Sequence, residues 1–264
     1  MTKTLLIVAA VVLFIPNLLK INPFTEKAYN RQEEFDPKLG RLSSMGDLST
    51  YIDSLAAHDH LLPGSYEFVL EISRLIRMRF YHGYCHFSFN ENWIAAASGR
   101  LLGHGLGTKV HPGTILKSSN AACSQQAIVM MALLREKHIP YRHLGFPHHY
   151  AVEAFIDNKW YFFDPNMEPN LSKEQRSADN WKYVGDNLKP YYSRWGQAQV
   201  DYIFGINKQS VKGGVNEVPA PNARLFQGTA GVLSKTIWCL PLILLYLRSR
   251  SMFPFRSRKK IIAV

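Results

Sequence analysis

The stretch NAACSQQAIVMMALLREKHIPYRHLGFPHHYAVEAFIDNKWYFFDPN, residues 120–166, decides the fold class of this chain. Its first part has apolar residues at helical spacing, which predicts a helix with Asn120 or Ser119 as N-cap. The strand-like run YRHLGF follows, and then two β-rich runs, HYAVEAFI and KWYFFD, which are separated by Asp157 and Asn158. We therefore expect an α+β fold in which one helix precedes antiparallel strands, the last two forming a hairpin.

Three residues of this stretch stand where their chemistry is altered: Cys123, His149 and Asp164. Cys123 falls in the first turn of the predicted helix, where unpaired N–H groups and the helix dipole favour the thiolate over the thiol. A two-residue loop in the hairpin would pair Ala151 with Asp164, and so place His149 and Asp164 diagonally on one face, about 7–8 Å apart. A three-residue loop would send the two side chains to opposite faces.

The residues around this Cys, His and Asp resemble the transglutaminase-like superfamily, which belongs with the papain-like cysteine enzymes. ACSQQAIVMMALLREKHIPYR is similar to the cysteine helix of that family, and HYAVEAFIDNKWYFFDPN is similar to its histidine strand. The resemblance covers about residues 120–166, with a weaker likeness at ENWIAAASGRLL. Ala121 and Ala122 stand where a glycine is common, and Val152 stands where the family often has an aromatic residue; these departures concern the substrate groove.

The resemblance implies a membrane-anchored, bacterial-type member of this fold, with a helical N-terminal part and a nucleophile helix packed on a small antiparallel sheet. It implies Cys123 as nucleophile, His149 as general base and acid, and Asp164 as the group that orients the imidazole. The thiolate would attack an amide or ester carbonyl and form a thioester. If water attacks this thioester, the protein is a peptidase or amidase; if an amine attacks it, the protein is an acyl transferase. The alternative is a non-catalytic domain of the same fold that binds a peptide, glycan or assembly partner in an envelope membrane complex.

An oxyanion formed in this reaction needs hydrogen-bond donors. We expect the backbone N–H of Cys123 to supply one donor, and we consider three side chains as candidates for a second: Asn92, Trp93 and Gln125.

Other interpretations of the cysteines and histidines stay open at this point. Three cysteines are too few for a disulfide scaffold and lack the CxxC spacing of a structural zinc site. Cys123 could still be a buried thiol or the disulfide partner of Cys85. His143, His148 and His149 lack a carboxylate or thiol at normal ligand spacing, so we expect no metal and no cofactor. Glu153 is expected to have a structural role, paired with Arg142 or Lys159, and the alternative is that it lines the substrate groove.

The net charge of +11 is concentrated at the ends of the chain. Eight basic residues lie there, which leaves +3 for residues 21–247: Lys3, Lys20, Arg248, Arg250, Arg256, Arg258, Lys259 and Lys260. The body therefore lacks the basic stripe of a nucleic-acid-binding protein, and we expect a peptide, protein or cell-envelope substrate instead.

Hydropathy at the two ends predicts the domain organisation. We expect residues 1–20 to form a signal anchor; the competing interpretation is a cleaved secretory signal. We expect residues 230–247 to form a second transmembrane helix. Because basic residues favour the cytoplasmic side, both ends are expected in the cytoplasm, and the domain between them is expected outside it, in the periplasm of a bacterium. The remaining boundaries are a linker at 21–45, the transglutaminase-like domain at 46–205, a tether at 206–229 and a basic tail at 248–264.

Overall fold

The computed structural model describes residues 2–30, 33–177 and 184–251. The chain divides into two compact units. The sheet unit comprises Thr25–His86 and Thr108–Arg224, and the helical unit comprises the chain up to Phe24, Phe87–Gly107 and the chain from Leu225. The predicted domain at 46–205 is therefore interrupted, because residues 87–107 cluster with the terminal helices.

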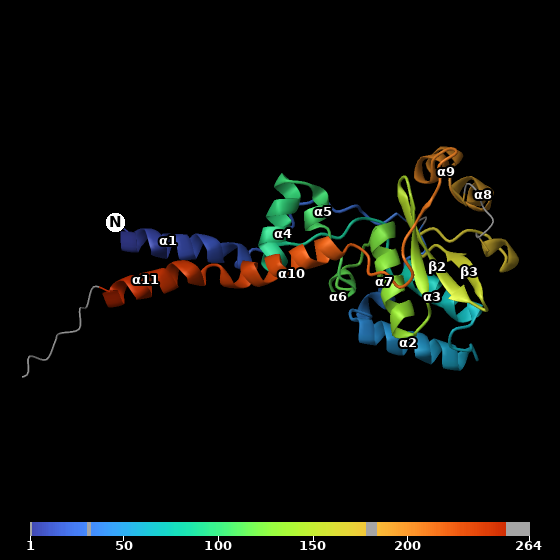
Figure 1. Cartoon of the computed structure of the whole chain (residues 1–264), viewed down its shortest axis with the longest axis horizontal. Coiled ribbons are helices and arrows are strands. Elements are labelled where there is room, and N and C mark those ends of the chain that lie inside the picture. Colours follow the sequence, from blue (N-terminus) through green and yellow to red (C-terminus); the bar gives the residue numbers. More distant parts are fainter. Residues whose placement is uncertain (1, 31–32, 178–183, 252–264) are drawn as a thin grey trace, which may run out of the picture. The chain divides into compact units, whose positions relative to one another are not determined.

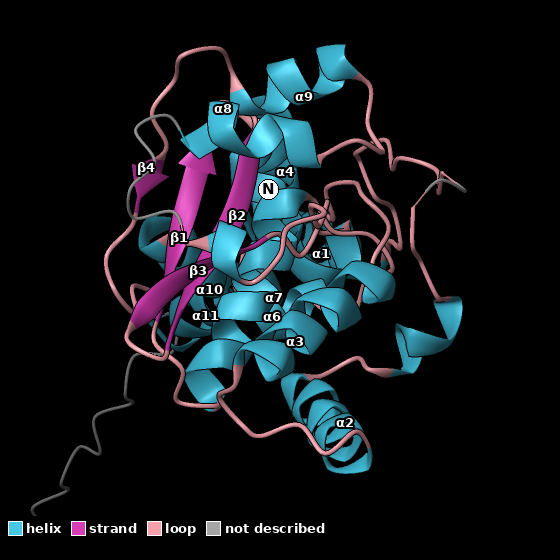
Figure 2. Ribbon diagram, turned by 90° about the vertical axis from the view of Figure 1, so that its right-hand side faces the viewer, coloured by secondary structure: helices cyan, strands magenta, loops and turns pink. Residues whose placement is uncertain are grey.

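The sheet unit contains a four-stranded antiparallel sheet with the order β3-β2-β1-β4 (Figure 2). The strands are β1 (Tyr141–Phe146), β2 (His149–Ile156), β3 (Lys159–Phe163) and β4 (Val211–Lys212). β2 and β3 pair in the predicted register, with Phe155 opposite Trp160. Asp157 and Asn158 form the two-residue loop with φ values of 49° and 63°, as a type I′ turn requires. The α+β class and the hairpin are thus confirmed.

Three longer helices form the other layer of the sheet unit: α2 (Met45–His58), α3 (Tyr66–Arg79) and α7 (Cys123–Glu136). Ser44 and Ser65 cap α2 and α3 by accepting backbone N–H groups. The predicted N-cap of α7 is wrong, since Ala122 takes that position. Asn120 instead donates to the carbonyls of Gly83 and Tyr84 at 3.3 and 2.9 Å, and so ties the segment before α7 to the chain at 81–86.

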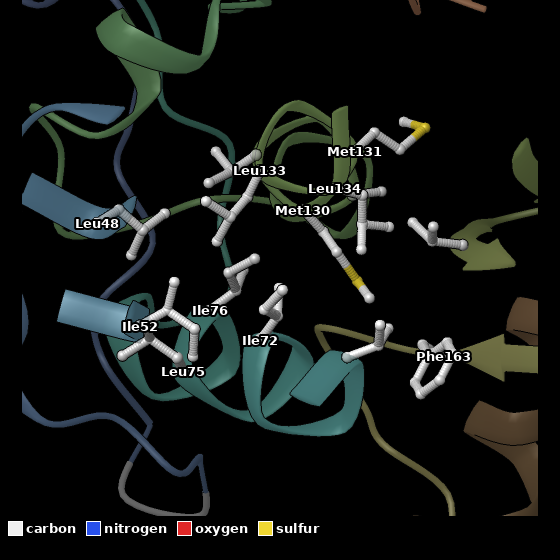
Figure 3. Close-up of a cluster of buried hydrophobic side chains, with 14 of the residues drawn as sticks. Leu48, Ile52, Ile72, Leu75, Ile76, Met130, Met131, Leu133, Leu134 and Phe163 are labelled. Carbon is white, nitrogen blue, oxygen red and sulfur yellow. The ribbon is translucent and has the colours of Figure 1, made fainter. Parts of the chain in front are cut away.

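Two apolar clusters enclose the sheet. The larger lies between α2, α3, α7 and the sheet, where Ile52, Ile76 and Met130 are fully buried (Figure 3). The smaller covers the other face with α8 (Val184–Leu188), α9 (Gln197–Phe204) and the adjoining chain, and includes Tyr192 and Phe204. Aromatic residues of the stretch after β3 therefore pack on the sheet; two others, Trp181 and Tyr183, lie outside the described residues. Short helices complete the unit: η2 (Pro37–Arg41), α6 (Pro112–Ile115), η3 (Glu174–Arg176) and η4 (Lys189–Tyr191).

Two predicted connectors have structural roles. The linker at 21–45 contains η2, and Leu39 and Leu42 are buried in the larger cluster. The tether at 206–229 contains β4, which extends the sheet beyond β1, and its end already belongs to α10. Both corrections have one physical reason: these segments find their partners far away in the sequence, where no local periodicity announces them.

The helical unit consists of α1 (Thr2–Phe14), η1 (Ile15–Leu18), α4 (Phe89–Leu101), α5 (His104–Gly107), α10 (Pro221–Thr236, which begins in the sheet unit) and α11 (Cys239–Ser251). α1 runs alongside α11 (Figure 1), and the rings of Phe14 and Trp238 meet edge to face at 5.2 Å. α4 has a break at Asn92, whose φ and ψ are −158° and 82°.

Within the described residues, no single helix is long and apolar enough to cross a bilayer by itself. α10 and α11 satisfy the length and composition together, across a bend of 49°, and residues 3–18 form a shorter apolar helix. The two flanking transmembrane helices of the sequence analysis are therefore not supported as single spans. The C-terminal helix breaks before Cys239 where the prediction had it continuous, and the tail beyond residue 251 lies outside the described residues.

Candidate active site

The site is built around the start of α7. Cys123 is the first residue of this helix, and its sulfur lies in the wall of a cavity within the sheet unit. In the described part of the chain, the backbone N–H of Cys123 has no hydrogen-bond partner, as is usual for the first turn of a helix. A thiol at this position has positive partial charges beside it and access to a bound molecule.

His149 and Asp164 form a buried pair on the hairpin. His149 begins β2, Asp164 follows β3, and the histidine Nε2 lies 2.6 Å from the aspartate Oδ2. The two-residue loop fixes the register of the hairpin, and this register places His149 and Asp164 on the same face. The structure therefore brings these two side chains together as the sequence analysis expected.

The Asp164 carboxylate is held from several sides. Its Oδ1 accepts backbone N–H groups from Asn166 and Met167 at 3.0 and 2.9 Å, and its Oδ2 accepts the Tyr192 hydroxyl at 2.7 Å. Burial alone would raise the pKa of Asp164, but the His149 charge and these hydrogen bonds hold it below its ordinary value. Asp164 is thus a fixed, buried anion that orients the imidazole.

His149 lies between this anion and Cys123. His149 lies close enough to Cys123 for the two side chains to interact, and since Asp164 occupies Nε2, the nitrogen that remains for the sulfur is Nδ1. Burial alone would lower the pKa of His149, but Asp164 and, to a smaller extent, Cys123 raise it to about 10. The imidazole is therefore protonated at neutral pH and lies beside the sulfur as a cation.

The cavity next to these groups has a volume of about 1110 Å³. This volume is at the upper end of the range for ligand sites, and peptide-sized molecules fit it. Cys123, His149 and His82 contribute to its wall together with aromatic residues of the stretch after β3: Tyr191, Tyr192, Trp195 and Tyr202. Burial lowers the pKa of His82 to about 4, so this second imidazole is neutral beside the charged one.

The three side chains expected as oxyanion donors are used elsewhere. The Asn92 amide donates to the Gln227 carbonyl, and the Trp93 indole donates to the Ser234 carbonyl, both inside the helical unit. The Gln125 amide donates to the carbonyls of Cys85 and Lys109 at 2.9 and 2.8 Å. The expectation for these three side chains is therefore wrong: of the expected donors, only the Cys123 N–H is without a partner in the described chain.

Gln125 has a structural role in place of the expected one. Its Oε1 accepts the N–H groups of Ala122 and Cys85 at 3.1 and 3.0 Å. The side chain thereby fixes the residue before Cys123 to the neighbouring segment at 81–86. Cys85 carries a free thiol in this network, so the disulfide alternative for Cys123 does not hold.

Two further expectations from the sequence concern Glu153 and a metal site. Glu153 is fully buried and pairs with Arg142, which lies opposite it on β1, so the structural interpretation is confirmed. Over the described chain, no three His, Cys, Asp or Glu side chains converge closely enough to hold a metal ion.

Sequence reasoning missed several residues of the site. Tyr192 is one of these residues, and no local pattern connects it to an aspartate 28 positions earlier. Lys27, Glu33 and Glu34 line the cavity from a segment that was interpreted as a linker. Because this segment is polar and has no hydrophobic periodicity, its sequence did not indicate that these residues line a cavity.

Comparison with known proteins adds no assignment: no protein-family model, no curated protein and no solved structure matches the chain. The interpretation of the site therefore rests on its residues and on their geometry.

Proposed function

We propose that this protein is a cysteine enzyme of the transglutaminase-like superfamily, which attacks an amide or ester carbonyl through Cys123, His149 and Asp164. One observation carries the proposal: a buried Asp164–His149 pair at 2.6 Å lies beside a cysteine at a helix start, in the wall of a cavity. A histidine within reach of a thiol, held by a third group, is the arrangement that nucleophilic catalysis requires. The helix before a small antiparallel sheet is also the fold that the resemblance implies.

The reaction begins with the proton on His149. Asp164 raises the pKa of this imidazole to about 10, so Nδ1 holds the proton that the sulfur releases, and the attacking group is the thiolate. The thiolate attacks the carbonyl carbon, and the C=O electron pair moves to the oxygen. The Cys123 N–H faces this oxyanion and stabilises it.

The second half of the reaction returns the proton. His149 protonates the leaving amine or alcohol, the C–N or C–O bond breaks, and a thioester remains on Cys123. Water, or an amine acceptor, then attacks the thioester while His149 takes its proton. The products are a carboxylate or a new amide, and the sulfur leaves as the thiolate beside the imidazolium.

We place this chemistry at a membrane surface outside the cytoplasm, with both termini inside. The support lies in the helical unit, where α1 and α11 expose apolar side chains such as Leu5, Val12 and Leu244 along their length. Exposed apolar surface on two adjacent helices fits lipid better than water. A peptide, a protein or a component of the cell envelope is then the acyl donor within reach.

The test of the chemistry is formation of the thioester. Full-length protein in detergent is treated with p-nitrophenyl acetate, and the acetylated residue is identified by peptide mass spectrometry. We expect an acetyl group on Cys123 that hydroxylamine releases, and a burst of p-nitrophenol equal to the enzyme concentration. Cys85→Ser is the matched control and should keep the burst, whereas Cys123→Ser should lose it. Acetylation of Cys123 no faster than that of a free cysteine would refute the proposal.

The location is tested separately with the cysteines of the chain. In intact cells, a membrane-impermeant thiol reagent that has access to the extracytoplasmic space should modify Cys123 and leave Cys239, at the start of α11, unmodified. Modification of Cys123 only after the cytoplasmic membrane is opened would place the domain inside.

A further inference from the structure

Two arginines stand in the cavity wall in addition to the catalytic groups. Arg77 extends from α3, and Arg194 precedes α9; both belong to the sheet unit and line the same cavity as Cys123. They meet on one carboxylate: Glu34 lies 3.0 Å from Arg77 Nε, and its other oxygen contacts Arg194 Nη1. A pair of guanidinium groups on one carboxylate is the geometry by which proteins recognise acidic ligands.

Glu34 does not occupy all the hydrogen-bond donors of the two arginines. Arg77 Nη1 is buried and, among the described residues, lacks a hydrogen-bond partner; the nearest oxygen of Glu168 is 3.9 Å away, which is too far for a hydrogen bond. Arg194 keeps 78% of its side chain exposed and holds Glu34 through one nitrogen only. Donor groups are thus available for a carboxylate that is better placed than Glu34.

The charges around the pair favour an anion. Glu168 already has its own cation in the buried Arg176, so it does not neutralise the arginine pair fully. Without Glu34, the arginines would leave positive charge in the wall, where Lys27 lies beside its own carboxylate, Glu33. Arg77 and Arg194 also lower the pKa of Glu34 against the effect of its burial, so their field is strong enough to hold a carboxylate ionised.

We propose that Arg77 and Arg194 form a subsite for a carboxylate of the substrate, and that Glu34 occupies this subsite in the free protein. The preferred acyl donor is then a peptide with an acidic residue near the scissile bond, which displaces Glu34 on binding. This inference rests on the proposed cysteine chemistry and names its substrate class.

The experiment uses peptidyl vinyl sulfones, which alkylate a catalytic cysteine. One glutamate is moved through three positions of an acetylated tripeptide of otherwise alanine residues, and each probe is matched with its glutamine counterpart. The rate of Cys123 modification in the full-length protein is measured by mass spectrometry. At one position we expect the glutamate probe to react about tenfold faster than the glutamine probe, the scale of one charge-assisted contact.

Three variants test whether the arginine pair and Glu34 cause the preference for the glutamate probe. Arg194→Gln should reduce it to about twofold or less, and Glu34→Gln should speed the glutamate probe by about threefold or more, because the internal competitor is removed. Arg41→Gln removes the same charge from an exposed position outside the cavity wall and should change nothing. Because Arg194 is exposed and Glu34 is at the surface, none of these variants threatens the fold.

The possible failures can be told apart. Equal rates for all glutamate and glutamine pairs, with Cys123 modified, would overturn the carboxylate subsite and leave the cysteine enzyme intact. A glutamate preference that survives Arg194→Gln and does not rise in Glu34→Gln would also overturn it. No modification of Cys123 beyond the rate of a free thiol would remove the proposed function, and this inference with it.

Discussion

Two cysteines of the sheet unit lie in adjacent segments and have opposite surroundings. Cys123 begins a helix, is 7% exposed, lies beside a charged imidazole and lines a cavity. Cys85 is 1% exposed, and the Gln125 amide contacts its sulfur at 3.1 Å. Burial raises the pKa of Cys85 to about 11, against the smaller effects of Lys109, Ser118 and Gln125. The comparison teaches that the reactivity of a thiol in this fold is set by its neighbours, since the residue type and the unit are the same.

The largest expected effect is the difference in reactivity between these two thiols. At pH 7 a thiol with a pKa of about 11 is ionised to about one part in ten thousand, and Cys85 must also be uncovered before a reagent can reach it. We expect iodoacetamide to alkylate Cys123 at least about a thousandfold faster than Cys85 in the native protein. Quantitative mass spectrometry of the two peptides gives the ratio.

The control for this ratio is the unfolded protein. In urea the two cysteines should react at similar rates, because their surroundings are gone. Equal, slow rates in the native protein would mean that the environment of Cys123 does not activate it, and would favour the non-catalytic alternative.

A second, smaller effect is expected when the cation beside Cys123 is removed. In His149→Ala the sulfur behaves as an ordinary thiol, of which well under 1% is ionised at pH 6. Alkylation of Cys123 at this pH should fall by about a hundredfold and then climb with rising pH, whereas the wild-type rate should be nearly flat from pH 6 to 8. Stopped alkylation time courses over this pH range distinguish the two profiles, and a parallel climb in both proteins would contradict the thiolate–imidazolium pair.

The sequence could predict those parts of the site that local rules determine. The hairpin register followed from Asp157 and Asn158, two residue types that accept positive φ and so permit a two-residue loop. That register alone placed His149 beside Asp164. The start of the nucleophile helix was predicted within one turn, although Ala122 and not a polar residue precedes it.

The parts that depend on distant contacts could not be predicted. Tyr192 reaches Asp164 only because the chain after β3 folds back over the sheet. Glu34 enters the cavity from a polar segment whose spacing carries no signal, and Val211 extends the sheet in a strand of two residues, too short for any pattern. Gln125 was the opposite case, since its position beside Cys123 suggested a donor to substrate while its amide is used within the fold.

A third prediction concerns stability and its dependence on pH. A histidine whose pKa is raised on folding stabilises the fold fully below its ordinary value near 6.5, and this stabilisation is lost as pH rises through the raised value of about 10. In Cys123→Ala, where Asp164 still raises the pKa of His149, the free energy of unfolding should therefore fall between pH 6.5 and 8.5, by up to about 1.4 kcal/mol per pH unit. Urea titrations at three pH values measure this slope.

The wild-type protein should show only a small rise over the same range, because the lowered pKa of His82 stabilises the fold as pH rises through the ordinary histidine value near 6.5. In the proposed reaction the imidazole holds the proton that the sulfur releases, so this pair binds the same number of protons in the folded and the unfolded protein. The raised pKa of Cys85 lowers the free energy of unfolding only above pH 9, the ordinary pKa of this thiol, which lies outside this pH range. A wild-type slope as steep as that of Cys123→Ala would mean that Cys123 keeps its proton in the folded state.

The smallest expected effect comes from Tyr192→Phe, which removes one donor from the buried Asp164 carboxylate and leaves its bonds to His149, Asn166 and Met167. A buried charged group that loses one of several hydrogen bonds costs about 1–2 kcal/mol of unfolding free energy, which a urea titration at pH 7 measures. Alkylation of Cys123 should change less than about threefold, because Asp164 still holds the imidazole. Tyr191→Phe is the matched control: its hydroxyl accepts only an exposed hydrogen bond from Gln175 at 3.3 Å, so its stability should stay at the wild-type value. Equal stability losses in the two variants would show that the Tyr192 hydroxyl contributes no more to the buried anion than a surface hydroxyl does.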